Sequence, residues 1–231
     1  ANNSDQPNFS WKAIASGLHD AYITQFAKDA AAYHYPFAIR VLSEMNGNWY
    51  PWGANVNGNT NSADYVTAWK HIIDIFRVEG AANVRFIWCQ SCMEASKISE
   101  YGDGLRQLYP GDDYVDWIAL DGYANSRNNW RSLQEVFQPS YQLLTSFSAR
   151  PMAFFEVGAT EKSFYPMAKS NWITRGFLTA IPQQFPGVKA VNWFNSHWDT
   201  NPESYAVDTS ANSLNAWKKV VVSPLYQASF S

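Results

Sequence analysis

Five short apolar segments recur at regular intervals, and their spacing constrains the fold more than any other feature of the chain. They begin at residues 37, 84, 115, 151 and 188, so successive starts lie 31 to 47 residues apart. Continuous apolar runs of this length are typical of parallel strands that are buried on both faces. The predicted strands are Phe37–Leu42, Val84–Cys89, Val115–Leu120, Pro151–Phe155 and Val188–Phe194.

Helical patterns lie between these strands. The predicted helices run from Asp20, as a capping residue, to about residue 35, and over Ser62–Val78, Gln134–Phe147 and Asn171–Ile181. A strand, a loop and a returning helix form one βα unit, so the chain is an α/β protein with either a (β/α) barrel or a doubly wound sheet. No G-x-G-x-x-G follows any strand, which argues against a dinucleotide-binding fold.

Composition indicates a single domain over residues 1–231. The chain is 46% hydrophobic and has a net charge of −3 without a basic block, which argues against a nucleic-acid partner. No apolar run approaches the roughly 20 residues of a membrane helix, so we expect no membrane contact. The chain opens on Ala1 rather than Met. We expect a secreted protein whose signal peptide is removed or not included.

Two cysteines, Cys89 and Cys92, are separated by two residues. A structural zinc site needs four ligands, and no second Cys pair or His pair accompanies this one. A thioredoxin-like context is also absent. We therefore expect two thiols or a local disulfide, no metal site and no cofactor.

Acidic residues at strand ends are the candidates for chemistry. In a barrel, catalytic groups cluster at the carboxyl ends of the strands. Glu44 follows the first predicted strand, Asp121 follows the third, and Glu156 ends the fourth. By contrast, Asp112 and Asp113 precede their strand, and we assign them to a structural turn.

Glu44 and Glu156 form the best carboxylate pair. Glycoside hydrolysis with retention uses two carboxyl groups about 5–5.5 Å apart, one protonated as acid and one ionised as nucleophile. Gly158 follows Glu156 at a point where we expect the chain to turn. A lone glutamate at a strand end is more often a cap or an ion-pair partner, but a pair among aromatic residues favours catalysis.

The aromatic content supports a sugar-binding cleft. Phe, Trp and Tyr make up 16% of the chain, with 11 Trp. Trp is seldom fully buried, and packing in the core accounts for about half of the aromatic residues. The candidate substrate-binding residues are Arg40, Asn46, Trp49, Trp52, Trp88, Asp121, Trp193 and Trp198.

The segment "RVLSEMNGNWYPWG", residues 40–53, resembles the acid/base segment of glycoside hydrolase family 26, which usually reads R-x-x-H-E-M-N-G-x-W-x-x-W-G. The resemblance continues through "NVRFIW", "YPGDDYVDWIALDGY", "RPMAFFEVGAT" and "VKAVNWFN", and it covers nearly the whole chain in order. It implies a barrel of TIM type and a double displacement with retention on β-mannan, mixed-linkage β-glucan or β-xylan.

The resemblance also implies roles for individual residues. Glu44 matches the acid/base, Glu156 the nucleophile and Tyr123 a tyrosine that contacts the nucleophile. Trp49 matches an aromatic residue beside the cleaved bond, and Trp193 a sugar-stacking tryptophan. Arg40 would share a face with Glu44 if the strand stays regular, and would tune that acid electrostatically.

Ser43 departs from the family pattern, which has His before the acid/base in its mannanases. This change favours a retaining endo-β-glycanase that acts on mixed-linkage β-1,3-1,4-glucan. The alternatives are an endo-β-1,4-mannanase and, in a different class, a non-catalytic carbohydrate-binding protein.

The strand count is the second departure. The family barrel has eight strands and this chain has five, while "SGLHDAYITQFA" resembles the segment before the fourth strand of the family. We therefore expect an incomplete TIM-type barrel of about five βα units without the first three. An open sheet exposes two edges, and we expect a second copy or another chain to cover them, so a homo-oligomer is one expectation.

Overall fold

The computed structural model describes residues 4–161, 168–197 and 204–226, and the chain divides into two compact units. Unit 1 consists of Ala1–Ser91, Ser96–Ala119 and Leu144–Pro151. Unit 2 consists of Cys92–Ala95, Leu120–Leu143 and Met152–Ser231. Each unit is described by itself.

Five strands form the sheet, and their order in the sheet is their order in the chain. They are β1 (Phe37–Arg40), β2 (Val84–Ser91), β3 (Trp117–Ala124), β4 (Met152–Ala159) and β5 (Val188–Trp193). β1 pairs with β2 in parallel, and so does β4 with β5. The five predicted strands are confirmed, although β1 ends earlier than predicted and the next three strands end later.

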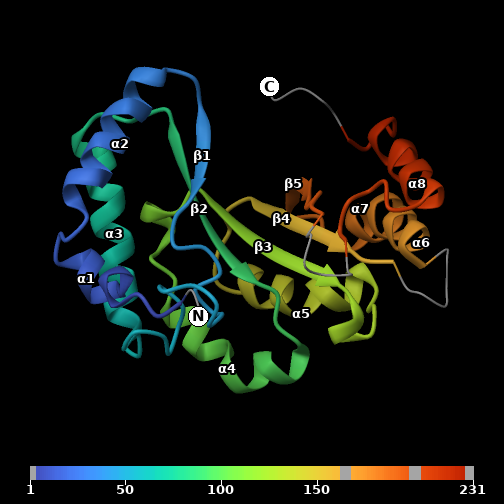
Figure 1. The fold of residues 1–231 in the computed structure, drawn as a ribbon, viewed down its shortest axis with the longest axis horizontal. Helices are drawn as coiled ribbons and strands as arrows, with labels where there is room; N and C mark the ends of the chain where they lie inside the picture. The colour runs from blue at the N-terminus through green and yellow to red at the C-terminus, as the bar shows by residue number, and fades with distance from the viewer. Residues whose placement is uncertain (1–3, 162–167, 198–203, 227–231) are drawn as a thin grey trace. The chain divides into compact units, whose positions relative to one another are not determined.

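Unit 1 packs helices onto its strands. α1 (Trp11–Ala15) and α2 (Asp20–Tyr33) both lie against α3 (Ser62–Val78), as Figure 1 shows in blue and teal. α3 has the predicted boundaries, and its apolar stripe is buried. The Asn61 side chain caps it by accepting from the amide of Ala63 at 3.2 Å.

The predicted cap at Asp20 is wrong. Asp20 is the first residue inside α2, and the capping position is His19, which makes no side-chain capping bond. The Asp20 carboxylate instead lies 2.6 Å from Nε2 of His71 on α3. It therefore ties two helices together.

The short helix η2 (Asp112–Tyr114) confirms a structural role for the acidic turn. The Asp112 carboxylate accepts from the hydroxyl of Tyr109 at 2.5 Å and from that of Ser148 at 3.1 Å. The carbonyl oxygen of Asp113 accepts from Arg77 at 2.5 Å. Two further helices complete the connections near β2 and β3, namely α4 (Ala95–Gln107), which the sequence did not predict, and α5 (Leu133–Thr145).

In unit 2 the predicted helix at 171–181 begins earlier and is irregular. α6 (Ala168–Arg175) leads into a π-helical turn, η4 (Gly176–Ala180), and then into α7 (Ile181–Gln184). An unpredicted helix, α8 (Ala211–Val221), packs against α6. No helix in the described ranges is long and apolar enough to cross a membrane.

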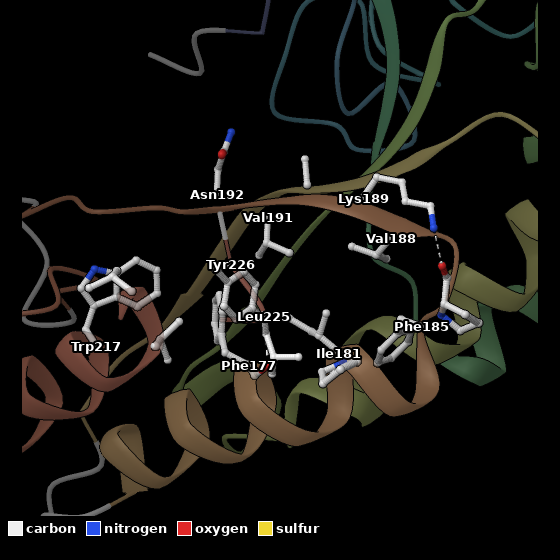
Figure 2. A pocket seen from close by; sticks show the side chains of 15 residues that line it. Phe177, Ile181, Phe185, Val188, Lys189, Val191, Asn192, Trp217, Leu225 and Tyr226 are labelled. Atoms are coloured by element: carbon white, nitrogen blue, oxygen red, sulfur yellow. Dashed lines mark hydrogen bonds between the residues drawn. The ribbon is translucent and has the colours of Figure 1, made fainter. Parts of the chain in front are cut away.

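An apolar cavity of about 590 Å³ lies between β5 and these helices. Figure 2 shows Phe177, Ile181 and Phe185 projecting from η4, α7 and the residue after α7 toward the valines of β5. No carboxylate lines this cavity, so it offers no chemistry of the expected kind. β5 is the last strand in the sheet order, and the coverage of the sheet edges by another chain stays a prediction.

Lys169 on α6 is a buried cation of unit 2, with 1% exposure. Its ammonium group donates to the carbonyl oxygen of Ala206 at 2.6 Å and to the hydroxyl of Thr209 at 2.9 Å. Burial lowers the pKa of Lys169 to about 8, while Glu161 and Asp208 oppose that shift. The lysine therefore fixes the segment before α8 at a cost in desolvation.

We predict that this cost appears as a pH dependence of stability. Between about pH 8 and pH 10.5 the unfolded chain binds a proton that folded Lys169 has lost, so stability rises with pH. The free energy of unfolding of wild type minus that of Lys169→Met should grow by up to about 3 kcal/mol from pH 7 to pH 10.5. Urea unfolding across this range measures it, with exposed Lys219→Met as the control. A difference that is constant or falls contradicts the prediction.

Candidate active site

Glu44 lies in a tight turn after β1 in unit 1. β1 ends at Arg40, and both Leu42 (φ 42°) and Glu44 (φ 54°) adopt left-handed backbone conformations. The amide of Glu44 donates to the carbonyl oxygen of Cys89 at 2.8 Å, and the residue is 8% exposed. Non-glycine residues in this conformation store strain, and such residues cluster at functional sites. The turn therefore marks Glu44 as a functional candidate.

The condition set for a shared face of Arg40 and Glu44 is not met. It required a regular strand through residue 44, and the strand stops four residues earlier. Arg40 is instead positioned over β2, where its guanidinium lies 3.8 Å from Sγ of Cys89. A shared strand face therefore cannot be the route by which Arg40 acts on Glu44.

Trp49 holds the carboxylate of Glu44. Its indole N–H donates to Oε2 of Glu44 at 2.7 Å, and its side chain is 45% exposed. Gly47 makes this possible, because a Cβ there would lie 2.4 Å from the indole ring. Trp49 thus orients the acid and still offers an aromatic surface to a ligand.

Asn46 and Trp52, both predicted to bind substrate, use their polar groups on the backbone. The amide of Asn46 donates to the carbonyl oxygen of Ser91 at 2.8 Å and accepts from its N–H at 3.0 Å. The Trp52 indole donates to the carbonyl oxygen of Ser43 at 2.8 Å, and its ring stacks on Tyr50. Both residues therefore fix the loop that carries Glu44.

Glu156 lies in unit 2, within β4 rather than at its end. The hydroxyl of Tyr123 on the neighbouring strand β3 donates to Oε2 of Glu156. A hydrogen bond to an ionised carboxylate is among the stronger kinds in proteins. Tyr123 therefore fixes the orientation of this carboxylate.

Two aromatic residues that the sequence did not single out pack around Tyr123. The rings of Tyr205 and Phe194 lie 4.9 and 5.5 Å from its ring, centroid to centroid. The hydroxyl of Tyr205 accepts from the side chain of Asn125 at 2.9 Å. Phe194 directly follows Trp193 on the last strand, but no sequence signal indicates Tyr205.

Gly158 does not form the predicted turn, because β4 continues to Ala159. A Cβ at Gly158 would lie 2.8 Å from the ring of Tyr205 and 3.0 Å from that of Tyr123. The glycine is therefore required for the close approach of these two rings to β4.

Trp88 and Trp193 were both predicted to bind substrate. Full burial contradicts this role for Trp88, whereas Trp193 is half-buried and its role stays a prediction. Trp88 is fully buried, with edge contacts to Tyr109 and Phe147. The ring of Trp193 packs between side chains of α6 and α8, with Trp217 at 5.5 Å.

Asp121, Trp198 and the two cysteines complete the set of predicted residues. Asp121 is buried inside β3 rather than beyond its end, which contradicts its assignment to substrate binding. Trp198 lies outside the described residues. No disulfide joins Cys89 to Cys92, so both are thiols. Within the described ranges, no three His, Cys, Asp or Glu side chains group as metal ligands.

We predict that Gly158→Ala destabilises the chain by about 1–3 kcal/mol, because the methyl group overpacks Tyr123 and Tyr205. Gly104→Ala in α4 is the matched control, since a Cβ there meets no atom within 4 Å and alanine favours the helix. The control should be neutral or stabilising in urea unfolding. Equal effects of the two substitutions contradict the packing argument.

Comparison with known proteins identifies the family. The model of "Glycosyl hydrolase family 26" matches residues 10–208. Endoglucanase H of Acetivibrio thermocellus is 33% identical over 216 residues, which are 90% of this chain and 22% of that protein. Mannan endo-1,4-beta-mannosidase A and B of Caldalkalibacillus mannanilyticus is 31% identical over 173 residues, 74% of this chain and 30% of that protein. The chain therefore spans less than a third of either relative.

Solved structures of the same family have a similar fold. A GH26 beta-mannanase from Bacteroides ovatus has a TM-score of 0.61 at 20% identity, covering 94% of this chain and 63% of that one. A modular endo-beta-1,4-mannanase from Cellulomonas fimi has a TM-score of 0.66 at 18% identity, covering 93% and 49%. This likeness confirms the expected fold class, an α/β fold of the TIM barrel type with five βα units in this chain. The chain belongs to glycosyl hydrolase family 26.

Proposed function

We propose that this chain is the catalytic part of a retaining endo-β-glycanase that cleaves a β-linked polysaccharide. One observation carries the proposal. Each of two glutamates has its carboxylate held by one aromatic donor, Glu44 by the indole of Trp49 and Glu156 by the hydroxyl of Tyr123. Family membership supports it, because hydrolysis by a carboxylate pair suits these residues.

The proposed reaction has two displacements. Glu156 attacks the anomeric carbon while Glu44 gives its proton to the departing glycosidic oxygen. Glu44, now ionised, takes a proton from water, and that water releases the sugar from Glu156 with retained configuration. Both carboxylates return to their starting protonation states, and the reaction needs no metal or cofactor.

The local geometry supports this division of roles. Glu44 is 8% exposed among large side chains, as suits a group that holds a proton in one step and takes one in the next. Glu156 receives the Tyr123 hydrogen bond, which limits rotation of the carboxylate and so favours a defined line of attack.

Mixed-linkage β-1,3-1,4-glucan is the first substrate we propose. Ser43 precedes the acid/base where the family's mannanases have His, and the identity to Endoglucanase H supports a glucan. An endo-β-1,4-mannanase is the second candidate, because several relatives are named mannan endo-1,4-beta-mannosidase. A carbohydrate-binding protein without turnover is the alternative in another class.

The first test concerns the two glutamates. Glu156→Ala should abolish hydrolysis of every substrate, because no nucleophile replaces it. Glu44→Ala should keep activity on aryl glycosides with good leaving groups, and azide should accelerate it and give a glycosyl azide of retained configuration. Normal turnover by Glu156→Ala would exclude it as the nucleophile. Absence of turnover by wild type on any polysaccharide would favour the binding protein.

The second test separates orientation from folding. Trp49→Phe removes the donor to Glu44, so kcat/KM should fall about tenfold while the melting temperature stays near wild type. Trp52→Phe is the matched variant. It loses the bond to the carbonyl oxygen of Ser43 and should lower the melting temperature. Wild-type kcat/KM in Trp49→Phe would mean that the indole does not orient the acid.

The third test concerns the substrate. Barley β-glucan and lichenan should be cut faster than galactomannan or xylan, with products resolved by size. Ser43→His should move the ratio of rates toward galactomannan if that side chain controls the preference. A clear preference of wild type for galactomannan would place the mannanase first.

A further inference from the structure

A polar cavity of about 460 Å³ lies in unit 2, lined by residues 126–131 together with Glu94 and Glu135. It adjoins the strands that carry Tyr123 and Glu156. The side chain of Asn128 donates to the carbonyl oxygen of Tyr123 at 2.5 Å. The backbone amide of Thr160 donates to the carbonyl oxygen of Ala124 at 3.0 Å. One lining residue, Asn128, is therefore bonded to the backbone of Tyr123, which connects the cavity wall to strand β3.

The loop around this cavity is held from several sides. The short helix η3 (Ser126–Asn128) is capped by two side chains. The side chain of Asn125 accepts from the amide of Arg127, and the side chain of Asn128 accepts from the amide of Asn125, both at 3.0 Å. The indole of Trp130 donates to the hydroxyl of Thr160 at 3.1 Å. Arg131 pairs with Glu94 at 3.0 Å, and its carbonyl oxygen accepts from Trp172. These bonds preorganise the loop, which lowers the entropy cost of binding a ligand.

The backbone of the loop is strained. Asn129 (φ 54°) and Trp130 (φ 49°) are consecutive non-glycine residues in the left-handed region. That conformation is a genuine outlier for a residue as bulky as tryptophan. Strain of this kind persists where the surrounding contacts over-determine the backbone, and it collects at ligand sites.

Two hydrogen-bonding groups of the lining are uncommitted. Throughout the described residues, the guanidinium of Arg127 and the side-chain amide of Asn129 have no hydrogen-bond or ion-pair partner. Glu135, by contrast, accepts from the amide and hydroxyl of Ser132 at 2.8 and 2.7 Å. With Arg131 paired to Glu94, the two arginines and two glutamates of the lining cancel in charge.

We propose that this cavity is a subsite for one neutral glycosyl residue of the β-linked chain, which rests on the function proposed above. Sugar hydroxyls both donate and accept, so they match the arginine fork and the amide, while Trp130 adds apolar surface. The balanced charge favours a neutral hexose over a uronic acid. A pocket with a few fixed polar groups around an aromatic side chain is typical of small-ligand sites.

The experiment measures oligosaccharide binding to Glu156→Ala by calorimetry, so that the ligand is not hydrolysed. The probes are β-1,4-mannohexaose, a mixed-linkage gluco-hexasaccharide and a β-1,4-linked mannuronate hexasaccharide. Arg127→Ala should weaken the better-bound neutral hexasaccharide about tenfold. Asn129→Gly should also weaken it. Glycine tolerates the positive φ, so this variant removes the amide without adding backbone strain at residue 129.

Arg175→Ala is the matched control, because Arg175 is an exposed arginine of the same unit outside the cavity. It should leave the Kd unchanged. The subsite is rejected if Arg127→Ala and Asn129→Gly keep the Kd within twofold of the parent, if Arg175→Ala loses as much, or if neither neutral hexasaccharide binds. Tighter binding of the mannuronate overturns the neutral assignment. Hydrolysis of polysaccharide by wild type is scored separately, so binding without turnover rejects catalysis and keeps the subsite.

Discussion

The hydrogen bond from the amide of Glu44 to the carbonyl oxygen of Cys89 is the constraint on which the loop after β1 depends. β1 has already ended at Arg40, so regular strand pairing no longer holds the chain at residue 44. This bond and the paired bonds between Asn46 and Ser91 dock the loop on the end of β2. Once the loop is docked, Gly47 lets Trp49 fold back onto the carboxylate.

Glu156 is positioned by a different principle. It lies on a strand with neighbours on both sides, so the ladder fixes its backbone, and Tyr123 on β3 supplies the partner for its side chain. The close packing in this region occurs at Gly158, where the absence of a Cβ leaves room for the rings of Tyr123 and Tyr205. Strain in the turn at Glu44 and close packing at Gly158 are thus two ways of fixing a carboxylate.

The sequence predicted the strands well because apolar runs and their spacing are local properties. Their ends were less accurate, because β2 and β4 continue through polar residues such as Gln90 and Glu156, which paired backbone accommodates. It was harder to predict which face of a strand each side chain occupies. A strand such as β2, buried on both sides, lacks the alternation that separates cleft from core, so Trp88 was assigned to the cleft although it lies in the core. Tyr205 was missed because long-range packing alone brings it to Tyr123.

The abundance of tryptophan has a physical explanation beyond sugar stacking. The indole N–H is a donor on a long, rigid side chain, and many of the tryptophans use it to fix a distant loop. Trp11, Trp52, Trp69, Trp172 and Trp193 each donate to a backbone carbonyl oxygen between 9 and 45 residues away in sequence. Trp130 donates to a hydroxyl, and Trp49 donates to the carboxylate of Glu44. A tryptophan whose indole N–H holds a distant loop is partly buried, whereas stacking on a sugar needs an exposed ring. The exposed fraction of the side chain therefore separates these two roles. Trp49, 45% exposed and bonded to an acid, combines such a hydrogen bond with an exposed aromatic surface.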